Sequence, residues 1–396
     1  MTVSARYSLV GFVMVLQWLG VAALAEIRRV PEEYATIQGA IDASFDGDVV
    51  EVGPGVYAEG LNFGGREITV RSTSGAGSTV VDPVSGRCLT VNGQKGAGAR
   101  LEGITLRGGS ASEGGGVYIA SSSPTLVGCV ISGNASSYSG GGVYVQSGSP
   151  KLIGCTVSGN TASSFGGGLA VEGGSVVVEG GSVSGNVSEG GAGVYMGSGS
   201  LQWSGGTISM NTSSYRGGGL YLQGGFAALA DVTVSGNTSV GDGGGLWSST
   251  DVTLTTCVVE ANDAGGYGGA WYKTGSTCVL QSSEVRNNSA STVGGIWIAQ
   301  GGMQVAGTLF CGNGVNINGS YTDQGGNELN GQCPPACPGD ANGDTRVDGG
   351  DIAVTLARWG ACVDEECYSD FNGDGTVDGA DLGILLTAYG GCFDAP

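Results

Sequence analysis

One short phrase recurs along the middle of the chain, and its regular spacing constrains the fold more than any other feature. Between Glu113 and Asn313 a run of glycines precedes an apolar residue and then, usually, Tyr or Trp. The apolar positions follow one another at 25 or 26 residues and are Val117, Val143, Leu169, Val194, Leu220, Leu246, Trp271 and Ile296. An asparagine recurs in step with them, at Asn134, Asn160, Asn186, Asn211, Asn237, Asn262, Asn288 and Asn313. Two markers with one period indicate one supersecondary unit that is stacked many times.

The pattern inside one unit predicts what is stacked. Residues 116–120, 124–127 and 129–131 are short apolar runs bounded by Gly or Ser, as strands are. Three strands and three turns in about 25 residues predict one coil of a parallel β-helix, with neighbouring coils about 4.8 Å apart. The aliphatic residues of each coil are expected to point inward and to stack.

The two polar markers are expected to build the turns. An asparagine amide at a turn can bond the same amide one coil away, and Asn tolerates left-handed backbone angles. The glycine triplets are expected to be corner residues with positive φ. They are not a phosphate-binding loop, because no helix is predicted after them.

The ends of the chain differ from the repeats. Residues 1–25 have a positive residue, an apolar run and a small-x-small site, which predicts a secretory signal peptide; a membrane anchor is the rival interpretation. No later stretch is apolar enough to span a bilayer. We therefore expect a secreted or cell-surface protein with a β-helix over residues 26–333 and a separate module over 334–396. The N-terminal cap of the β-helix is expected over about residues 26–82. Within it, the apolar residues of 34–43 are spaced as in an amphipathic helix, which would cover the open end of the first coil.

The net charge argues against one class of partner, and the number of cysteines bears on whether the chain contains disulfides. The formal net charge is −20, which argues against nucleic acid as a partner because phosphates need Lys and Arg. In an exported chain, the eleven cysteines are expected to form some disulfides, and their odd number leaves at least one unpaired or paired with another molecule.

The N-terminal segment and the repeats resemble a known superfamily. Residues 34–57, with Tyr34-Ala-Thr-Ile-Gln and Gly47-Asp48-Val-Val-Glu-Val-Gly-Pro-Gly55, resemble the start of right-handed parallel β-helix proteins of the pectin lyase-like superfamily. The Gly-Gly-Gly-Val-Tyr and Ser-Gly-Asn repeats look like those of its non-enzymatic secreted members. The resemblance implies a mainly β, right-handed solenoid. It does not decide the activity, because the superfamily includes both polysaccharide-cleaving enzymes and adhesins.

An aromatic residue lies between the two inward aliphatic residues of almost every coil. If the alternation holds, these rings point outward on one face, where two interpretations stay open. Stacked rings can stabilise the sheet surface, or they can form a platform that contacts sugar rings. The candidates for glycan contact are Tyr118, Tyr144, Tyr195, Tyr221, Trp247, Tyr272 and Trp297.

Catalytic candidates in the repeats are few. Cleavage of acidic polysaccharides needs carboxylates on neighbouring coils, sometimes around a metal ion. The aspartates of residues 101–333 do not occupy equivalent positions on neighbouring coils, and the chain contains no His. Arg216 and Asp242 share the position before the glycines, one coil apart, which fits an exposed ion pair. A weak catalytic site remains a hypothesis, and its residues would be Arg216, Asp242, Asp251, Asp263 and Lys273.

The last residues contain two similar acidic loops, offset by 30 residues. Oxygen-bearing side chains at loop positions 1, 3, 5, 9 and 12, with a backbone carbonyl at 7, have the spacing of a Ca²⁺ loop. These positions predict two Ca²⁺ sites, formed by Asp340, Asn342, Asp344, Arg346, Asp348 and Asp351 and by Asp370, Asn372, Asp374, Thr376, Asp378 and Asp381. A helix is expected after each loop, at 351–359 and 381–389.

This loop–helix pair is similar to the type I dockerin module. The resemblance covers about 338–391 and implies a cohesin-like or surface protein as partner. Two departures stand out. The first loop has Thr345 at position 6, where Gly normally allows the sharp turn, so the first site is expected to bind more weakly. Positions 10 and 11, which the family uses for recognition, have almost no side chain (Gly349-Gly350 and Gly379-Ala380).

The cysteines of the module flank its loops. Since the two helices are expected to be antiparallel, we predict the pairs Cys337–Cys392 and Cys362–Cys367. In the β-helix predicted over residues 26–333, called the rod below, Cys129 and Cys155 occupy equivalent positions on adjacent coils. Stacked thiols and a disulfide are both compatible with the sequence there.

Two functions are compatible with these features. The favoured one is a non-catalytic secreted or surface rod that presents an elongated face to a glycan and attaches to a partner through its calcium-binding module. The alternative is a polysaccharide lyase or glycoside hydrolase that its dockerin-like module delivers.

Overall fold

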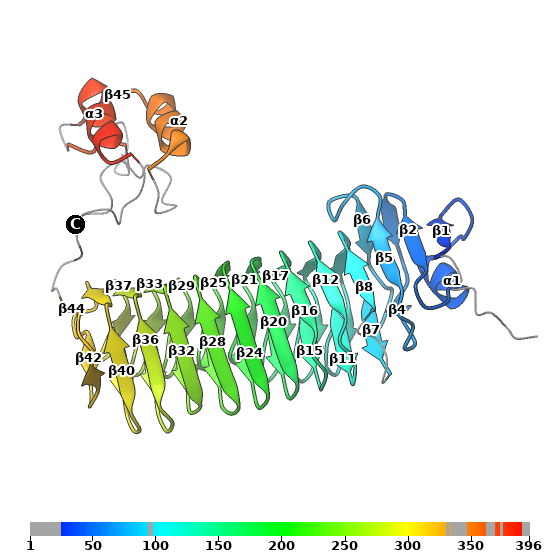
Figure 1. Cartoon of the computed structure of the whole chain (residues 1–396), viewed down its shortest axis with the longest axis horizontal. Coiled ribbons are helices and arrows are strands. Elements are labelled where there is room, and N and C mark those ends of the chain that lie inside the picture. The colour runs from blue at the N-terminus through cyan, green and yellow to red at the C-terminus, as the bar shows by residue number, and fades with distance from the viewer. Residues whose placement is uncertain are drawn as a thin grey trace, which may run out of the picture.

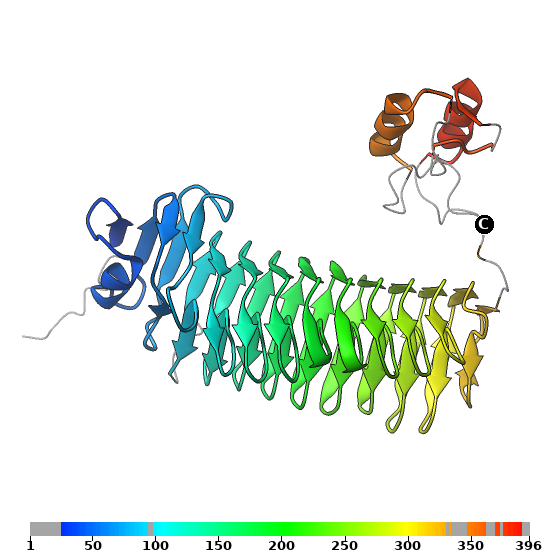
Figure 2. The same cartoon turned by 180° about the vertical axis from the view of Figure 1, so that it is seen from behind.

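The chain winds into a long stack of parallel strands (Figures 1 and 2). The computed structural model describes residues 25–93, 98–329, 333, 347–361, 369–372 and 375–389. Within residues 25–329 the strands form four parallel sheets, of 13, 12, 8 and 11 strands. The predicted parallel β-helix is therefore the fold of this part of the chain.

The first and second sheets run the length of the stack. The first sheet begins with β1 (Ile27–Val30) and ends with β43 (Thr322–Asp323), and the second runs from β3 (Gly55–Tyr57) to β44 (Glu328–Leu329). A typical coil contributes β12 (Thr125–Val127) to the first sheet and β13 (Val130–Ser132) to the second. Their central residues, Leu126 and Ile131, are completely buried inside the coil.

The third sheet was not expected, since three strands per coil were predicted and the central coils have four. Its short strands follow the asparagines. They are β10 (Ser110–Ala111), β14 (Ala135–Ser136), β18 (Thr161–Ala162), β22 (Val187–Gly190), β26 (Thr212–Arg216), β30 (Thr238–Ser239), β34 (Asp263–Ala264) and β38 (Ser289–Ala290). The backbone pairs with the neighbouring coil here before it turns back to the glycines.

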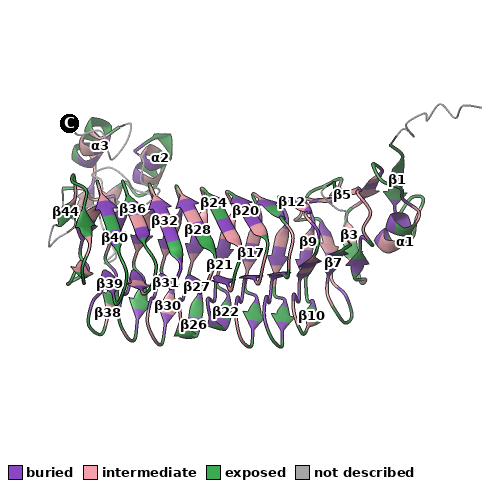
Figure 3. Ribbon diagram, turned by 60° about the horizontal axis from the view of Figure 1, so that its bottom comes forward, coloured by how far each residue is buried: buried purple, intermediate pink, exposed green. Residues whose placement is uncertain are grey.

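The fourth sheet contains the strands that follow the glycines. They are β4 (Leu61–Asn62), β7 (Leu89–Asn92), β11 (Val117–Ala120), β15 (Val143–Val145), β19 (Leu169–Val171), β23 (Val194–Met196), β27 (Leu220–Leu222), β31 (Leu246–Ser248), β35 (Trp271–Lys273), β39 (Ile296–Ile298) and β42 (Ile317–Asn318). The predicted inward residues, such as Val143 and Val145, are fully buried. Figure 3 shows buried residues along these strands and exposed ones at the loops.

A short helix covers the N-terminal end of the stack. α1 (Ile37–Asp42) begins at Thr36, whose side chain accepts a hydrogen bond from the Gly39 N–H. Ile37, Ala40 and Ile41 of this helix are completely buried against the first coils. The helix was predicted over 34–43, and it has the apolar face that an end cap requires.

The asparagines form the predicted ladder. From Asn160 to Asn313 the Oδ1 atom accepts two hydrogen bonds from the asparagine of the preceding coil. Asn211 Oδ1, for example, accepts from the Asn186 backbone N–H at 3.0 Å and from the Asn186 amide at 2.9 Å. Its own amide donates to the Val183 carbonyl and to Asn237 Oδ1. These side chains are buried, so the bonds satisfy polar groups that water does not reach.

The explanation predicted for the glycine triplets is correct only for their first member. Gly140, for example, has φ +68°, whereas Gly141 and Gly142 do not have positive φ. The second and third glycines are required because the backbone of the next coil lies against them. A Cβ on Gly142 would lie 2.6 Å from the Gly168 carbonyl oxygen and 2.8 Å from Val157 Cγ1.

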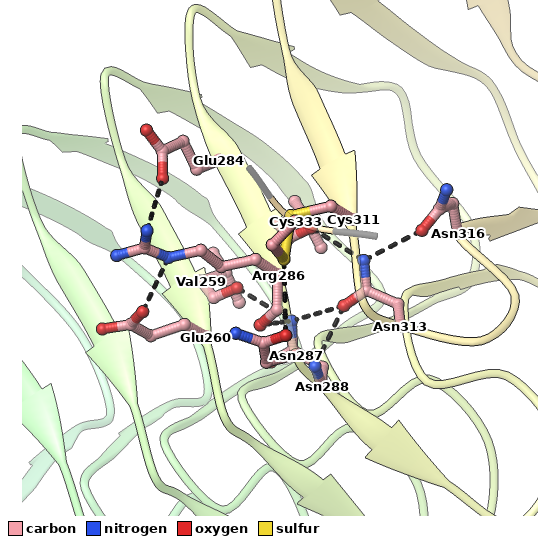
Figure 4. The surroundings of a disulfide bond; sticks show 11 residues. Val259, Glu260, Glu284, Arg286, Asn287, Asn288, Cys311, Asn313, Asn316 and Cys333 are labelled. Atoms are coloured by element: carbon pink, nitrogen blue, oxygen red, sulfur yellow. Dashed lines mark hydrogen bonds and ion pairs between the residues drawn. A yellow bond between two sulfur atoms is a disulfide. The ribbon is translucent and has the colours of Figure 1, made fainter. Parts of the chain in front are cut away.

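A disulfide closes the C-terminal end of the stack. Cys333 is bonded to Cys311 in β41 (Leu309–Cys311), so the last three strands, β42 to β44, lie inside the closed loop (Figure 4). Beside it, Asn313 ends the asparagine ladder by donating to Asn316 Oδ1 at 3.0 Å. A loop of this size is expected to stabilise the folded state by about 3 kcal/mol.

The C-terminal segment contains two helices, α2 (Gly349–Ala357) and α3 (Gly379–Thr387), which contact each other. Each begins two residues earlier than predicted, at an aspartate cap. In the described part of the chain, no helix has the length and apolar character needed to cross a membrane.

We predict that Asn211→Ala lowers the free energy of unfolding by at least about 2 kcal/mol, because it leaves buried donors of Asn186 without acceptors. The measurement is chemical denaturation followed by circular dichroism. Ser209→Ala, a half-buried residue two positions earlier, is the control and should change stability little. Equal effects of the two substitutions would contradict a structural role for the ladder.

Candidate functional site

The aromatic row on the outer face of the fourth sheet is mostly covered. Tyr144, Tyr195, Tyr221 and Trp247 are 4–7% exposed, and Tyr118, Tyr272 and Trp297 are half-buried. The rings point outward from the coil as the alternation predicted, but the interpretation of an open platform of seven rings is wrong. The reason is the loop before the glycines, which folds over this face: a Cβ on Gly140 would lie 2.7 Å from Tyr144 Cβ.

The covered rings form a second hydrophobic core outside the coil. Tyr118 and Tyr144 are stacked with centroids 5.6 Å apart, and Tyr221 meets Trp247 edge-on at 4.8 Å. Two arginines cover ring faces as well, Arg87 over Tyr118 and Arg216 over Trp247. The structural interpretation therefore accounts for most of the row.

One coil lacks the aromatic residue, and a neighbouring loop replaces it. The position holds Ala170, which is completely buried and belongs to the same cluster as Phe165. The Phe165 ring stacks on Tyr195 with centroids 4.6 Å apart. One coil further, the equivalent of Phe165 is Gly190, where a Cβ would lie 3.1 Å from the Phe165 ring. Ala170, Phe165 and Gly190 thus fit together as one local exception to the repeat.

Of the five weak catalytic candidates, the structure brings two together as an ion pair. Arg216 Nε and Asp242 Oδ2 are 3.5 Å apart at a partly exposed position, as the sequence predicted. The guanidinium also lies 4.6 Å from the Tyr215 ring centroid. In this arrangement Arg216 fixes the loop over Trp247.

The other three candidates do not join this pair. Asp251 begins β32 (Asp251–Thr255) in the first sheet, and Asp263 lies in β34 of the third sheet, where it accepts from the Ser289 hydroxyl. Lys273 takes an inward position and is completely buried, with Nζ donating to the carbonyls of Gly275, Ser276 and Gln300. Burial lowers its pKa. Placing Lys273 in a surface site with Asp242 was wrong, because the aliphatic slot it occupies faces the core.

The structure draws attention to two carboxylates that the sequence analysis did not single out. Glu113 precedes the first glycine triplet, and Glu172 follows β19 two coils further on. Burial raises the pKa of Glu172, and the charge of Glu113 raises it further. In the described part of the chain neither side chain has a hydrogen-bond or ion-pair partner. Their signal in the sequence is weak, because the position of Glu172 varies among the coils: the equivalent residues are Ala120, Gln146, Gly197, Gln223, Ser249, Thr274 and Ala299.

The acidic loops are described in part. Asp340, Asn342, Asp344, Arg346 and Asp374 lie outside the described residues. Among the described ones, no three acidic or Cys side chains converge as a metal site. Asp381, completely buried, accepts from the backbone N–H groups of Asp378 at 2.9 Å and Asn372 at 3.1 Å. Asp348 and Asp351 repeat the first of these bonds at 2.8 Å.

The cysteine predictions are tested only in the rod. Cys129 and Cys155 are free thiols, both buried, as are Cys88, Cys257 and Cys278. The Cys311–Cys333 bond was not predicted. The predicted pairs Cys337–Cys392 and Cys362–Cys367 lie outside the described residues.

Comparisons with known proteins support the fold. A family model described as "Right handed beta helix region" matches residues 154–328. This agrees with the right-handed parallel solenoid predicted from the sequence. The search among curated proteins found no match.

Three solved structures are weakly similar. Carrot pectin methylesterase aligns at 12% identity and TM-score 0.31, covering 75% of this chain and 88% of its own. Pectate lyase Pel9A aligns at 12% identity and TM-score 0.39, covering 80% and 83%. The catalytic unit of the GH87 α-1,3-glucanase from Streptomyces thermodiastaticus aligns at 14% identity and TM-score 0.36, covering 74% and 65%. At these values the activities of the three enzymes carry no implication for this chain.

We predict that Phe165 and Ala170 are energetically coupled. Phe165→Ala should lower stability by about 2 kcal/mol by removing a ring from the outer core, and Ala170→Phe alone should lower it by overpacking. The double substitution should cost less than the sum by 1 kcal/mol or more, on the order of couplings between touching residues. Thermal denaturation of the four proteins measures this coupling.

Phe45→Ala serves as the control for the loss of a ring, since this side chain is 76% exposed. It should have little effect. Additive effects of Phe165→Ala and Ala170→Phe would show that Phe165 does not replace the missing ring.

Proposed function

We propose that the protein is an extracellular, non-catalytic rod that attaches to a partner protein through a calcium-binding C-terminal module. The observation that carries this proposal is the pair of matching acidic loops, each leading into a helix with the same aspartate cap and capping box. Because the two loops match in sequence and in the geometry of the helix cap that follows, we expect each loop to bind the same kind of ligand.

The described part of the second loop fits a cation. Asp370 Oδ2 accepts from the Gly375 N–H at 2.7 Å, so the first ligand position is bonded to the sixth. Asp381, at position 12, is bonded to positions 3 and 9. A buried carboxylate is costly without a compensating cation, and among described residues Asp381 has no ion-pair partner. Oxygen ligands at this spacing favour Ca²⁺.

The rod supports a presenting role. Its catalytic candidates are dispersed over different sheets, and the Arg216–Asp242 pair is used to hold a loop. The length of the stack and its rigid ladders suit a spacer that carries a binding face at a distance from an anchored end. Secretion follows from the predicted signal peptide over residues 1–25.

The nature of the docking partner follows from the family resemblance alone. A cohesin-like or surface protein is the class that a dockerin-like module would bind. With Gly349, Gly350, Gly379 and Ala380 at the recognition positions, the contact would depend on the exposed helix residues. Leu356, Trp359, Leu386 and Tyr389 are large apolar residues of this segment that are at least half exposed, which is typical of a docking surface.

We predict two Ca²⁺ sites of unequal affinity, set by loop position 6. Gly375 has φ +86°, a conformation that a β-branched residue adopts only with strain. Gly375→Thr should therefore weaken the second site about tenfold, from a strain of roughly 1–2 kcal/mol. Thr345→Gly should strengthen the first site by a similar factor. Titration calorimetry with Ca²⁺ on the full chain measures both.

Gly379→Ala is the matched control, because Gly379 does not have positive φ and a Cβ there meets no atom within 4 Å. It should leave both affinities unchanged. The absence of Ca²⁺ binding by the unmodified protein would refute the proposal, and equal affinities at the two sites would refute the role of position 6.

A further inference from the structure

The first residue after the predicted signal peptide is held firmly at the end of the rod. Its backbone nitrogen, Glu26 N, donates to Asp48 Oδ1 at 2.9 Å, and its carbonyl accepts from the Val49 N–H at 2.9 Å. The next residue, Ile27, pairs with Val49 at the start of β1, the outermost strand of the first sheet, which contacts α1 (Figure 1). The backbone of Glu26 is therefore fixed on both sides, directly after Ala25.

The carboxylate that holds this nitrogen is buried and charged. Asp48 is 5% exposed, and its second oxygen accepts from Arg28 Nη1 at 2.5 Å and from the Phe45 N–H at 2.7 Å. Burial alone would raise the pKa of Asp48, but the hydrogen bonds from two backbone N–H groups and from Arg28 lower that pKa below its ordinary value. Asp48 is therefore an anion at neutral pH.

The charged cluster around Asp48 can take one more positive charge. Arg28 is 5% exposed and pairs with two carboxylates, that of Asp48 and that of Glu26, whose Oε2 atom lies 2.9 Å from Arg28 Nη2. The next arginine, Arg29, pairs instead with Glu51 at 3.6 Å. Among the described residues, this cluster thus contains two carboxylates and one guanidinium.

Removal of residues 1–25 would change the chemistry of the nitrogen at Asp48. In the precursor, Glu26 N belongs to a peptide N–H group, which is a neutral donor. After cleavage it belongs to an α-ammonium group, a cation with several N–H donors and an ordinary pKa of about 7.7–8.0. Charge-assisted hydrogen bonds are stronger than neutral ones, and salt screens a partly buried ion pair less than an exposed one.

We propose that cleavage after Ala25 leaves the α-ammonium group of Glu26 in an ion pair with Asp48, and that this pair completes the N-terminal cap of the rod. The cluster of Glu26, Arg28 and Asp48 is then a binding site for the new end of the chain. The small-x-small motif at residues 23–25 ends immediately before the residue that Asp48 holds. The proposal rests on the export that the proposed function includes.

Sequencing of the N-terminus tests the position of cleavage. The full precursor is produced in a secreting bacterial host, and the exported chain should begin at Glu26. A different first residue would overturn the proposal, because the positive charge would then lie away from Asp48. A chain that keeps residues 1–25 and stays in the cell would overturn both this proposal and the extracellular part of the proposed function.

The ion pair is tested with two chains that are released from a fusion without extra residues, one starting at Glu26 and one at Ala25. Asp48 should raise the pKa of the α-amine only in the first, since the second carries its charge one residue further away. A pKa raised by about one leaves about tenfold less free amine, so the first α-amine should be acylated about tenfold more slowly at pH 7. Peptide mass spectrometry measures the rates, with exposed Lys151 of β16 (Lys151–Ile153) as internal reference. Equal rates would overturn the proposal.

Substitution of the carboxylate should remove the difference between the two chains. With Asp48→Asn in both, the α-amines should be acylated at equal rates. Glu32→Gln is the matched control, an exposed carboxylate in the turn after β1, and it should preserve the difference. A difference that persists in Asp48→Asn would show that another group holds the α-ammonium. If Asp48→Asn fails to fold, the two unsubstituted chains still decide the matter.

Thermal unfolding gives a second readout. Because the pKa of the Glu26 α-amine is raised in the folded state, its contribution to stability is complete below the unfolded pKa of about 7.7 and is lost as the pH rises through the folded pKa. The chain starting at Glu26 should therefore unfold at a higher temperature than the chain starting at Ala25 at pH 7, and this advantage should shrink as the pH is raised. Tyr34, which hydrogen-bonds Arg28, is common to both chains and cancels in the comparison. An advantage that grows with pH would overturn the proposal.

Ca²⁺ titration of both chains separates this proposal from the proposed function. The two chains should bind Ca²⁺ equally, because the cluster at Asp48 belongs to the first coils and the acidic loops follow the rod. Equal acylation rates with intact Ca²⁺ binding would refute only the ion pair. Slow acylation of the Glu26 chain without Ca²⁺ binding would refute only the calcium-dependent attachment.

Discussion

The buried asparagine ladder is the interaction on which the rest of the rod depends. Each amide joins the turn of its own coil to the next coil, where its oxygen accepts from the backbone N–H and the amide of the neighbouring asparagine. Such a ladder tolerates no drift in register, which explains why the segment from the inward aliphatic residue to the asparagine is almost constant in length. Two coils are one residue shorter after their asparagine, between Asn186 and Val194 and between Asn288 and Ile296, and in the first of them the pairing is irregular between Ser188 and Gly190.

The loop that follows each asparagine gives the rod its second core. Because the second and third glycines lie against backbone atoms of the next coil, the chain can return close to the third sheet and lead straight into the fourth. The loop then covers the aromatic row. Burial of four rings on the outside of the coil adds apolar area that a narrow solenoid interior cannot supply. The local exception at Ala170 keeps this core filled through Phe165.

The period and composition of the repeats predicted the stacked coils, the inward aliphatic residues and the asparagine ladder. These features depend on neighbouring coils that carry the same residue, so the sequence contains both partners of each contact. Whether the rings of the aromatic row are exposed or covered depends on where a variable loop folds. The alternation of inward and outward residues carries no information on the position of that loop. Lys273 shows the converse: its slot predicted an inward side chain, but its charge led to a surface assignment. The acidic loops have the residue spacing of a Ca²⁺ site, and calcium binding by them stays a prediction.

A repeat protein provides its own controls, since every coil shows what its neighbours would look like without a specialised role. The change at Ala170 has a structural compensation in Phe165 and Gly190, so packing explains it. The position after the second inward residue shows the opposite case, because it holds Ala120, Gln146, Glu172, Gly197, Gln223, Ser249, Thr274 and Ala299 in successive coils, so the stack requires no particular residue there.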